Sequence, residues 1–381
     1  MALDFSQVKK WSIPVNGTNK EVVSVSVNES VLWKSGGDPY ITFSSTNSFS
    51  VLHTYAYSTS DNNNGTIQYS TDKVNWVNWN STSANRDSST ISSVNNKLYV
   101  RQINGSGKFG RRFYFASGSN ITISGELRSL INANDMDGIT NYGTNTFRYL
   151  FKNQSAIIDV SGLILPTTTV NYMYQDMFVS CDNLVNAGFD FKVDTIKFQM
   201  CYEMFMGCSS LTQAPKMKAV TICGDGCAYM FYGCSSLQYA PNGLSISSII
   251  TGSGDYYGGY HCRYMFMSCS SLRTIVPITI SGSVGVDTTQ SFAYMYSGCG
   301  ALTQIGKILI TGSVSSDAFE GMFDSVALYT TSSGTHTKAW RLPYSGTITS
   351  TMAMGWWYID DDLKKLQANT TYYIGNSIEI V

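Results

Sequence analysis

Cysteine is the most regularly placed residue in this sequence that could do chemistry. Eight of the nine cysteines fall into two series of a repeated motif, and Cys223 lies outside both. The first series is Cys181, Cys208, Cys234, Cys269 and Cys299, and the second is Cys201, Cys227 and Cys262. Zinc sites favour CxxC pairs in sets of four, which Cys223 with Cys227 does not supply. We therefore expect no metal, and we interpret the thiols as small apolar groups that fill a core.

Disulfide bonds between neighbouring copies of the motif are also disfavoured. An odd number of cysteines excludes complete internal pairing. Stacked strands lie roughly 4.8 Å apart with parallel Cα–Cβ vectors. A disulfide needs Cβ atoms about 3.8 Å apart on converging vectors. We predict free thiols throughout.

The three histidines, His53, His261 and His336, stand in no nucleophile-elbow or metalloprotease motif. A Ser-His-Asp triad assembled in space stays open, because its members need not be close in sequence. A carbohydrate-active enzyme would need a pair of facing carboxylates, and we find none in the repeated motif. We expect no catalytic residue and no cofactor.

Two acidic clusters have simpler interpretations. Asp360 to Asp362 is predicted to cap the start of a short helix. Asp135 and Asp137 resemble a fragment of a calcium loop. The twelfth position of that loop should be Glu, and here it is Thr146.

Tyrosine is the residue best suited to recognition. Tyr149, Tyr229, Tyr264 and Tyr294 each stand two residues before the central aromatic of the motif. On a helix that position points away from the apolar face, so an exposed row is expected. The run GSGDYYGGYH, residues 252–261, adds further tyrosines among glycines, a composition typical of adaptable contact loops. The predicted ligand-binding residues are Tyr229, Tyr256, Tyr257, Tyr260, Tyr264 and Tyr294; the alternative is that their rings pack on adjacent loops.

An internal repeat must position all of these residues. Its copies read YLFKNQSAI, DMFVSCDNL, EMFMGCSSL, YMFYGCSSL, YMFMSCSSL and YMYSGCGAL, followed by a worn GMFDSVAL. The central aromatics are Phe151, Phe178, Phe205, Phe231, Phe266, Tyr296 and Phe323, at spacings of 27, 27, 26, 35, 30 and 27 residues. Stacked copies would bury one continuous core.

Each copy is predicted to hold a short helix, a turn and a short strand. Cys227, Met230, Phe231 and Cys234 lie at i, i+3, i+4 and i+7, which is one face of a two-turn helix. A glycine such as Gly233 precedes the last cysteine, where a chain leaving a helix often turns left-handed. A β-branched stretch then favours a strand.

The pattern MF-x-x-C-x-x-L followed by a strand resembles the BspA-like leucine-rich repeats of bacterial surface proteins and of phages that infect gut bacteria. The resemblance covers about residues 147–328. It implies surface display and adhesion, and it does not identify a ligand. The run EVVSVSVNESVLWK from Glu21 predicts a strand or hairpin, and its VLWK ending resembles amino-terminal segments of phage tail and fibre proteins.

The predicted fold is mainly β with short helices: a leucine-rich-repeat solenoid, preceded by a small β-sandwich and closed by a C-terminal cap. Residues 1–35 are the expected attachment segment and 36–128 an immunoglobulin-like sandwich. In that sandwich, runs such as KLYVRQI from Lys97 and RRFYFAS from Arg111 predict strands. Residues 129–332 form the repeats and 333–381 the cap.

Composition narrows the function. Only 13% of residues are charged and the net charge is -1, so nucleic-acid binding is not expected. No apolar run reaches the length of a membrane span, and the start lacks the pattern of a signal peptide.

We expect a non-enzymatic virion protein, a phage tail or head fibre or decoration protein, on the virion surface. Its first segment would bind other virion proteins, and its repeats would bind a host glycan or protein. A homo-oligomer such as a trimer fits a fibre. The alternatives are a BspA-like adhesin on a bacterial cell surface and a carbohydrate-active enzyme on a solenoid scaffold.

Overall fold

The computed structural model describes residues 38–55, 65–79, 87–250, 259–281, 290–302 and 321–322, together with short strands near both ends. These strands are β1 Ser12–Val15, β2 Thr18–Glu21, β3 Ser24–Val27, β4 Ser30–Lys34, β18 Ile308–Thr311, β19 Thr330–Thr331 and β20 Gly334–Thr335. Strands β3 and β4 pair antiparallel, so the run from Glu21, predicted to be a strand or a hairpin, contains a hairpin. Tyr256, Tyr257, His336, Phe323 and residues 336–381 of the predicted cap lie outside the described residues.

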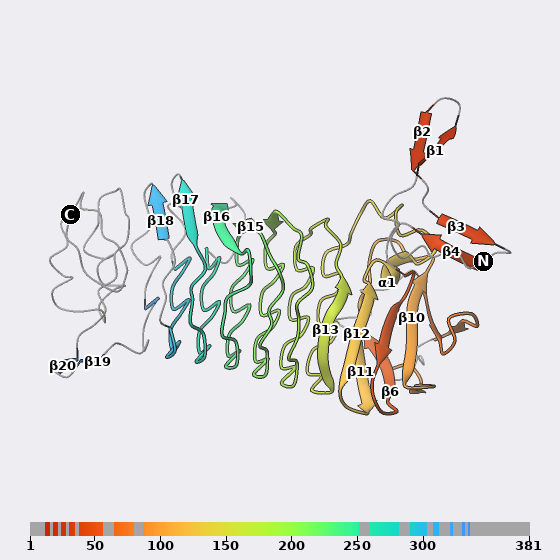
Figure 1. The fold of residues 1–381 in the computed structure, drawn as a ribbon, viewed down its shortest axis with the longest axis horizontal. Coiled ribbons are helices and arrows are strands. Elements are labelled where there is room, and N and C mark those ends of the chain that lie inside the picture. Colours follow the sequence, from red (N-terminus) through yellow and green to blue (C-terminus); the bar gives the residue numbers. More distant parts are fainter. Residues whose placement is uncertain are drawn as a thin grey trace.

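Two facing sheets make up the part of the chain before the repeats (Figure 1). The larger has the order β13-β12-β5-β10-β7-β8 and the smaller β11-β6-β9. Their bounds are β5 Ile41–Ser44, β6 Ser50–Tyr55, β7 Thr66–Ser70, β8 Val77–Asn78, β9 Ile91–Ser92, β10 Lys97–Ile103, β11 Arg111–Ser117, β12 Ile121–Glu126 and β13 Ile157–Ile164. Phe43 of β5 meets Phe113 of β11 edge to face at 5.2 Å between ring centroids, so the apolar faces of the two sheets share a core.

The larger sheet continues into the first copy of the motif. Helix α1, Ser129–Asn132, is a single turn after β12. Strand β13, which follows the YLFKNQSAI copy, pairs parallel with β12. The two regions that the sequence separates at residue 128 are therefore joined by backbone hydrogen bonds.

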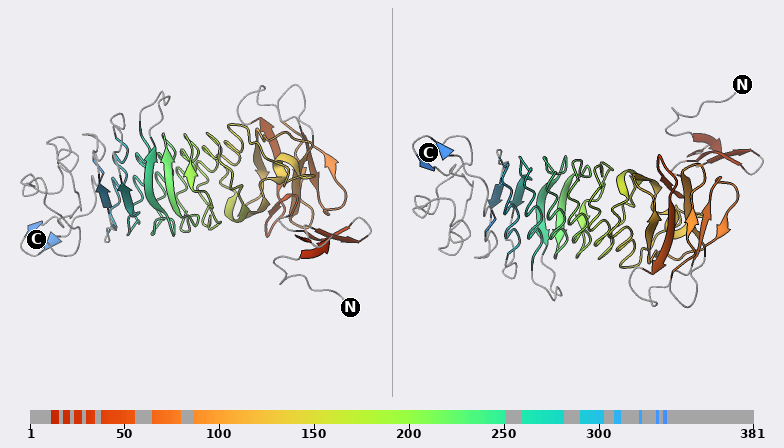
Figure 2. Two further views of the ribbon diagram at one scale, coloured as in Figure 1. Left: turned by 90° about the horizontal axis from the view of Figure 1, so that it is seen from above. Right: turned by 90° about the horizontal axis from the view of Figure 1, so that it is seen from below.

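Later copies each add one strand to a parallel sheet with the order β14-β15-β16-β17-β18. The new bounds are β14 Thr195–Ile196, β15 Ala219–Cys223, β16 Ser245–Ile250 and β17 Ile278–Ser281. Two further views show these strands following one another along the long axis (Figure 2). The described residues are mainly β, as predicted, and they contain almost no helix.

The predicted helix in each copy is wrong. Over the described residues, the motif segments form successive turns, and α1 is the one α-helix. The N–H of Cys208 donates to the carbonyl of Phe205 at 3.1 Å, while the N–H of Phe205 donates to Met230 of the next copy at 2.9 Å. Alternate N–H groups thus bond within a copy and between copies. In a helix all of these N–H groups would bond to carbonyls of the same segment. In stacked copies, half of them can bond to carbonyls of the neighbouring copy instead.

The inward face was predicted correctly despite the different backbone. Cys227, Met230, Phe231 and Cys234 are all fully buried. Phe113 of β11 and the six central aromatics from Phe151 to Tyr296 stack in one line, which we call the aromatic spine: Phe113, Phe151, Phe178, Phe205, Phe231, Phe266 and Tyr296. Ring centroids along it are 5.3 to 5.9 Å apart, and no interplanar angle exceeds 26°. The spine begins in the core of the two sheets and runs through the stacked copies without interruption.

Candidate functional site

The tyrosine row consists of Tyr229, Tyr264 and Tyr294, one from each of three successive copies. Each has a positive φ, between 53° and 59°. This left-handed conformation turns the side chain out of the core, so each tyrosine is half-buried while the methionine after it is fully buried. Ring centroids are 4.7 Å apart from Tyr229 to Tyr264 and 5.3 Å from Tyr264 to Tyr294. The three tyrosines therefore line up as expected, but they are half-buried rather than exposed, and their role in binding stays a prediction.

The rings of the row cover one another's faces. Tyr264 and Tyr294 lie within 18° of parallel. Gly321 sits so close to the ring of Tyr294 that any side chain there would collide with it. What the row offers to a ligand is therefore ring edges and phenolic hydroxyls rather than open ring faces.

Arg263 links the row to Tyr260. Its guanidinium carbon lies 4.5 Å from the ring centroid of Tyr264 and 4.7 Å from that of Tyr260, and Nη2 donates to the Tyr264 hydroxyl at 2.7 Å. The backbone N–H of Tyr260 donates to Asp225 at 3.2 Å. Tyr260 thus joins the surface predicted from the sequence, with a cation between it and the row.

Two tyrosines beside the row were missed by sequence reasoning. The rings of Tyr202 and Tyr232 lie 5.6 and 5.9 Å from Tyr229. Both are half-buried. They stand at other motif positions, Tyr202 directly before Glu203, so a search restricted to one aligned position could not find them.

The row is interrupted toward the amino-terminal end by two acids. Asp176 and Glu203 occupy the motif position of the tyrosines, two residues before Phe178 and Phe205. Their carboxyl groups are within hydrogen-bonding reach of each other. Asp176 is buried and forms an ion pair with Lys152, in which Oδ1 of Asp176 lies 2.6 Å from Nζ of Lys152. The expectation that the motif supplies no carboxylate pair is wrong, because it considered only the tyrosines at that position.

Burial raises the pKa of Glu203 to about 7, with a further contribution from the charge of Asp176 and the hydrogen bond to it. A carboxyl group with this raised pKa is partly protonated near neutral pH, so Glu203 can donate to Asp176. Glycoside hydrolases hold their carboxyl groups about 5 to 9.5 Å apart, which leaves room for a sugar or a water. Two carboxyl groups that are hydrogen-bonded to each other leave no such room, so the geometry of Asp176 and Glu203 does not fit glycoside hydrolysis.

The cysteines are buried, with Cys223 half-buried, and all nine are free thiols. Each thiol of the first series donates to the carbonyl of the central aromatic in the preceding copy, at 3.1 or 3.2 Å. Burial raises the pKa of the eight thiols that belong to the two series. Over the residues described, no group of three or more potential ligands comes together to hold a metal.

The two described histidines are fully buried. His53 Nε2 lies 2.8 Å from the carbonyl of Trp79, and burial lowers the pKa of its ring to about 4. His261 Nδ1 lies 3.2 Å from Ser291 Oγ, and Nε2 lies 3.3 Å from the carbonyl of Ile250. Ser291 is itself fully buried, so this serine–histidine contact is closed to a substrate.

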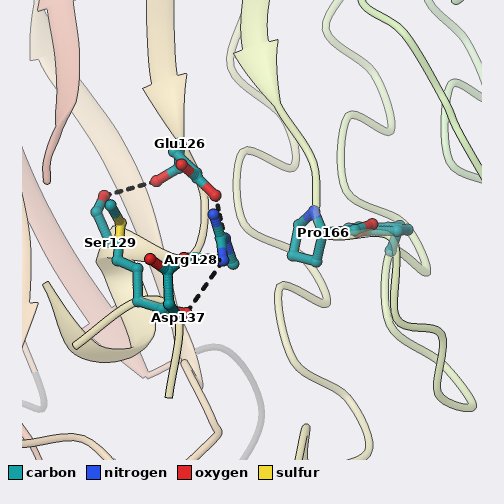
Figure 3. Close-up of polar contacts among 7 residues, drawn as sticks. Glu126, Arg128, Ser129, Asp137 and Pro166 are labelled. Atoms are coloured by element: carbon teal, nitrogen blue, oxygen red, sulfur yellow. Dashed lines mark hydrogen bonds and ion pairs between the residues drawn. The ribbon is translucent and has the colours of Figure 1, made fainter. Parts of the chain in front are cut away.

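The calcium-like fragment is used for structure (Figure 3). Asp137 accepts from Arg128 at 3.0 Å, and Arg128 also pairs with the buried Glu126. Asp135 accepts from the N–H of Gly138 at 2.9 Å, which forms a turn. These acids fasten the segment after α1 to the end of β12.

No known protein family, curated protein or solved structure matches the chain. The resemblance to BspA-like repeats therefore stays a prediction. Across the residues described, no helix combines the length and the hydrophobicity that crossing a membrane requires.

Proposed function

We propose that this chain is a non-enzymatic adhesion protein whose copies form a solenoid of the BspA-like leucine-rich-repeat kind. Its tyrosine row would bind a glycan or a protein on a host surface. The observation that carries the proposal is the contrast within each copy. Met265 and Phe266 are fully buried, while Tyr264 beside them stays half-exposed and in register with Tyr229 and Tyr294.

The chemistry of the row favours recognition through hydrogen bonds. The three rings, whose centroids lie 4.7 and 5.3 Å apart, present phenolic hydroxyls, which both donate and accept. Arg263 adds a guanidinium next to them. Sugar hydroxyls or polar peptide groups fit such a surface, and a chain-like ligand could contact several positions in turn.

We place the protein on a phage virion, as a tail or head fibre or a decoration protein. The amino-terminal segment would attach it to other virion proteins, and a trimer or other homo-oligomer would suit a fibre. The support is the VLWK leader joined to a surface-type repeat. A bacterial cell-surface adhesin is the alternative. Capsid, portal or tail genes beside this one would favour the virion; their absence beside a secretion signal would favour the adhesin.

The test of the row replaces Tyr229, Tyr264 and Tyr294 with Ala and measures attachment of the intact chain to host cells and to a glycan array. We expect attachment to fall about tenfold or more. The matched control is Tyr239→Ala, since Tyr239 is 57% exposed and makes no part of the row. Equal attachment by the triple variant and the control would refute the proposal.

Two further variants separate the parts of the surface. Tyr264→Phe removes one hydroxyl and keeps the stack, so it should weaken attachment several-fold if hydrogen bonds carry recognition. A second triple variant, Tyr256, Tyr257 and Tyr260 to Ala, tests the long loop separately. Unchanged binding would remove that loop from the site.

A further inference from the structure

A depression of about 540 Å³ lies on the outer face of the smaller sheet, a size in the range of small-molecule sites. Its lining is Leu52, Thr54, Tyr55, Asp87, Arg112, Tyr114, Phe115 and Ala116. Strands β6 and β11 build it, because Arg112 pairs in register with Thr54 and Tyr114 with Leu52. Directly paired residues hold their side chains close together on one face. The site thus brings a cation, a hydroxyl and apolar groups onto rigid strands.

Arg112 supplies the positive charge of this depression, and Asp87 supplies a negative charge. Its guanidinium carbon lies 4.1 Å from the ring centroid of Tyr114. Its Nε is buried and has no hydrogen-bond partner. Burial lowers the pKa of Arg112, and the negative charge of Asp87 at the exposed rim offsets part of this effect. A ligand carboxylate would give the guanidinium the planar, two-oxygen partner that suits it.

The depression lies next to the first copy of the motif, in which Tyr149 holds the position that the tyrosines of the row hold in later copies. The N–H of Phe113, next to Arg112, donates to the carbonyl of Leu150 at 2.9 Å. Arg112 interacts electrostatically with Tyr149, the first tyrosine at the row's motif position. Arg148 and Lys152 lie over the same ring, 4.6 and 4.8 Å from its centroid. Two further cations, Arg148 and Lys152, therefore lie around Tyr149, on the repeat side of Arg112.

We infer that this depression binds a uronic acid residue, that is, a sugar ring carrying a carboxylate. The carboxylate pairs with Arg112, and the ring hydroxyls bond to Thr54 and Asp87. Leu52 and Ala116 contact the apolar ring face. The inference rests on the proposed function, since it names an acidic sugar as one unit of the glycan that the tyrosine row would contact.

The direct test is calorimetric titration of the full chain with three probes: glucuronate, glucose and acetate. Glucuronate and glucose differ at one carbon, so the pair isolates the carboxylate, and acetate isolates the sugar ring. We expect glucuronate to bind about tenfold or more tightly than either of the others. Equal binding of glucose would overturn the role of Arg112, and equal binding of acetate would overturn the sugar.

Variants assign the binding to this site. Arg112→Gln should weaken glucuronate binding about tenfold or more, and Arg112→Lys should fall between, because an ammonium keeps the charge without the fork. Thr54→Val should weaken it several-fold. Arg273→Gln, an exposed arginine away from the depression, is the matched control, and thermal melts verify that each variant is folded. Unchanged binding by a folded Arg112→Gln would reject the site.

The two proposals fail separately. If the wild-type chain ignores glucuronate yet attaches to cells through Tyr229, Tyr264 and Tyr294, the uronic acid site is wrong and the tyrosine row stands. If glucuronate binds at Arg112 but the tyrosine variants attach normally, the row is wrong. The depression would then be the site of recognition.

Discussion

Asp176 and Glu203 stand at the same position in successive copies, and their carboxyl groups are hydrogen-bonded to each other beside Lys152. Tyrosines hold that position in the copies on either side. The pair therefore divides Tyr149 from the tyrosine row and places two carboxyl groups between them.

Glu203→Gln should change the pH dependence of stability. Burial raises the pKa of Glu203 from 4.5 to about 7, so between these values the folded chain holds a proton that the unfolded chain releases. This stabilisation is present at low pH and is lost as the pH rises through 7. Between pH 5 and pH 8, the free energy of unfolding of the wild type should fall by about 1–2 kcal/mol relative to Glu203→Gln, after allowance for solvent screening.

Urea denaturation at four or five pH values measures this difference. Lys152→Gln is a useful companion, because it removes the cation that stabilises the ionised pair and should steepen the loss. Parallel pH curves for wild type and Glu203→Gln would show that the pKa of Glu203 is not raised in the folded chain.

His53 should produce a pH dependence of the opposite sign. Burial lowers the pKa of its ring to about 4, so the folded chain keeps it neutral while the unfolded chain protonates it near 6.5. Its stabilisation is complete above that value and is lost as the pH falls toward 4, by roughly 3 kcal/mol at most. His53→Phe retains a ring against Trp79, 4.7 Å away between centroids, and removes the titration.

The comparison for His53 is the free energy of unfolding at pH 4.5 and pH 7. The wild type should lose more on acidification than His53→Phe does. The double variant with Glu203→Gln should be nearly flat across this range, because both opposing titrations are gone. An equal loss on acidification in wild type and His53→Phe would mean that the imidazole is not held neutral.

The thiols should react in two classes. Cys223 is half-buried, whereas the other eight are buried and have raised pKa values, so they form little of the reactive thiolate. A thiol-specific reagent at pH 8 should modify Cys223 in the native chain and reach the others only in denaturant. Cys223→Ser should abolish modification of the folded chain. Rapid modification of several thiols in that variant would show that the two cysteine series are not buried.

Gly233 and Ser268 should respond in opposite directions. They hold the same motif position with φ values of 72° and 63°, where a side chain is strained. A Cβ on Gly233 would have ordinary contact distances, the nearest atom being 3.8 Å away, so Gly233→Ala should cost about 1 kcal/mol through the backbone alone. Ser268→Gly should be neutral or stabilising. Denaturation midpoints decide, and a destabilised Ser268→Gly would exclude backbone strain as the cause.

The sequence predicted what depends on spacing. Residues about 27 apart do lie over one another, and Met230, Phe231 and Cys234 face the core. The left-handed glycine at Gly233 was also anticipated, and strands β10 and β11 begin at Lys97 and Arg111 as expected. These features follow from side-chain size and backbone freedom, which a repeat displays directly.

The features that could not be predicted from the sequence depend on contacts between segments that lie far apart in the chain. Four apolar residues at helical spacing suit a helix, but they equally suit turns whose free N–H groups bond to the next copy, as Phe205 does with Met230. The depression at Arg112 needs β6 and β11 to pair across about 60 residues of chain. The thiol-to-carbonyl bond of Cys208 likewise needs a neighbour that only stacking supplies.

The aromatic spine has a mechanical consequence. Phe113 belongs to the two facing sheets and Phe151 to the first copy, yet their rings stack at 5.9 Å, as the rings within the copies do. With β12 and β13 also hydrogen-bonded across this junction, bending or torsion there would break packing and backbone bonds at once. If the chain is attached through its amino-terminal end, the two facing sheets and the repeats should therefore move as one rigid body. The orientation of Tyr294 would then be set by that of Phe113.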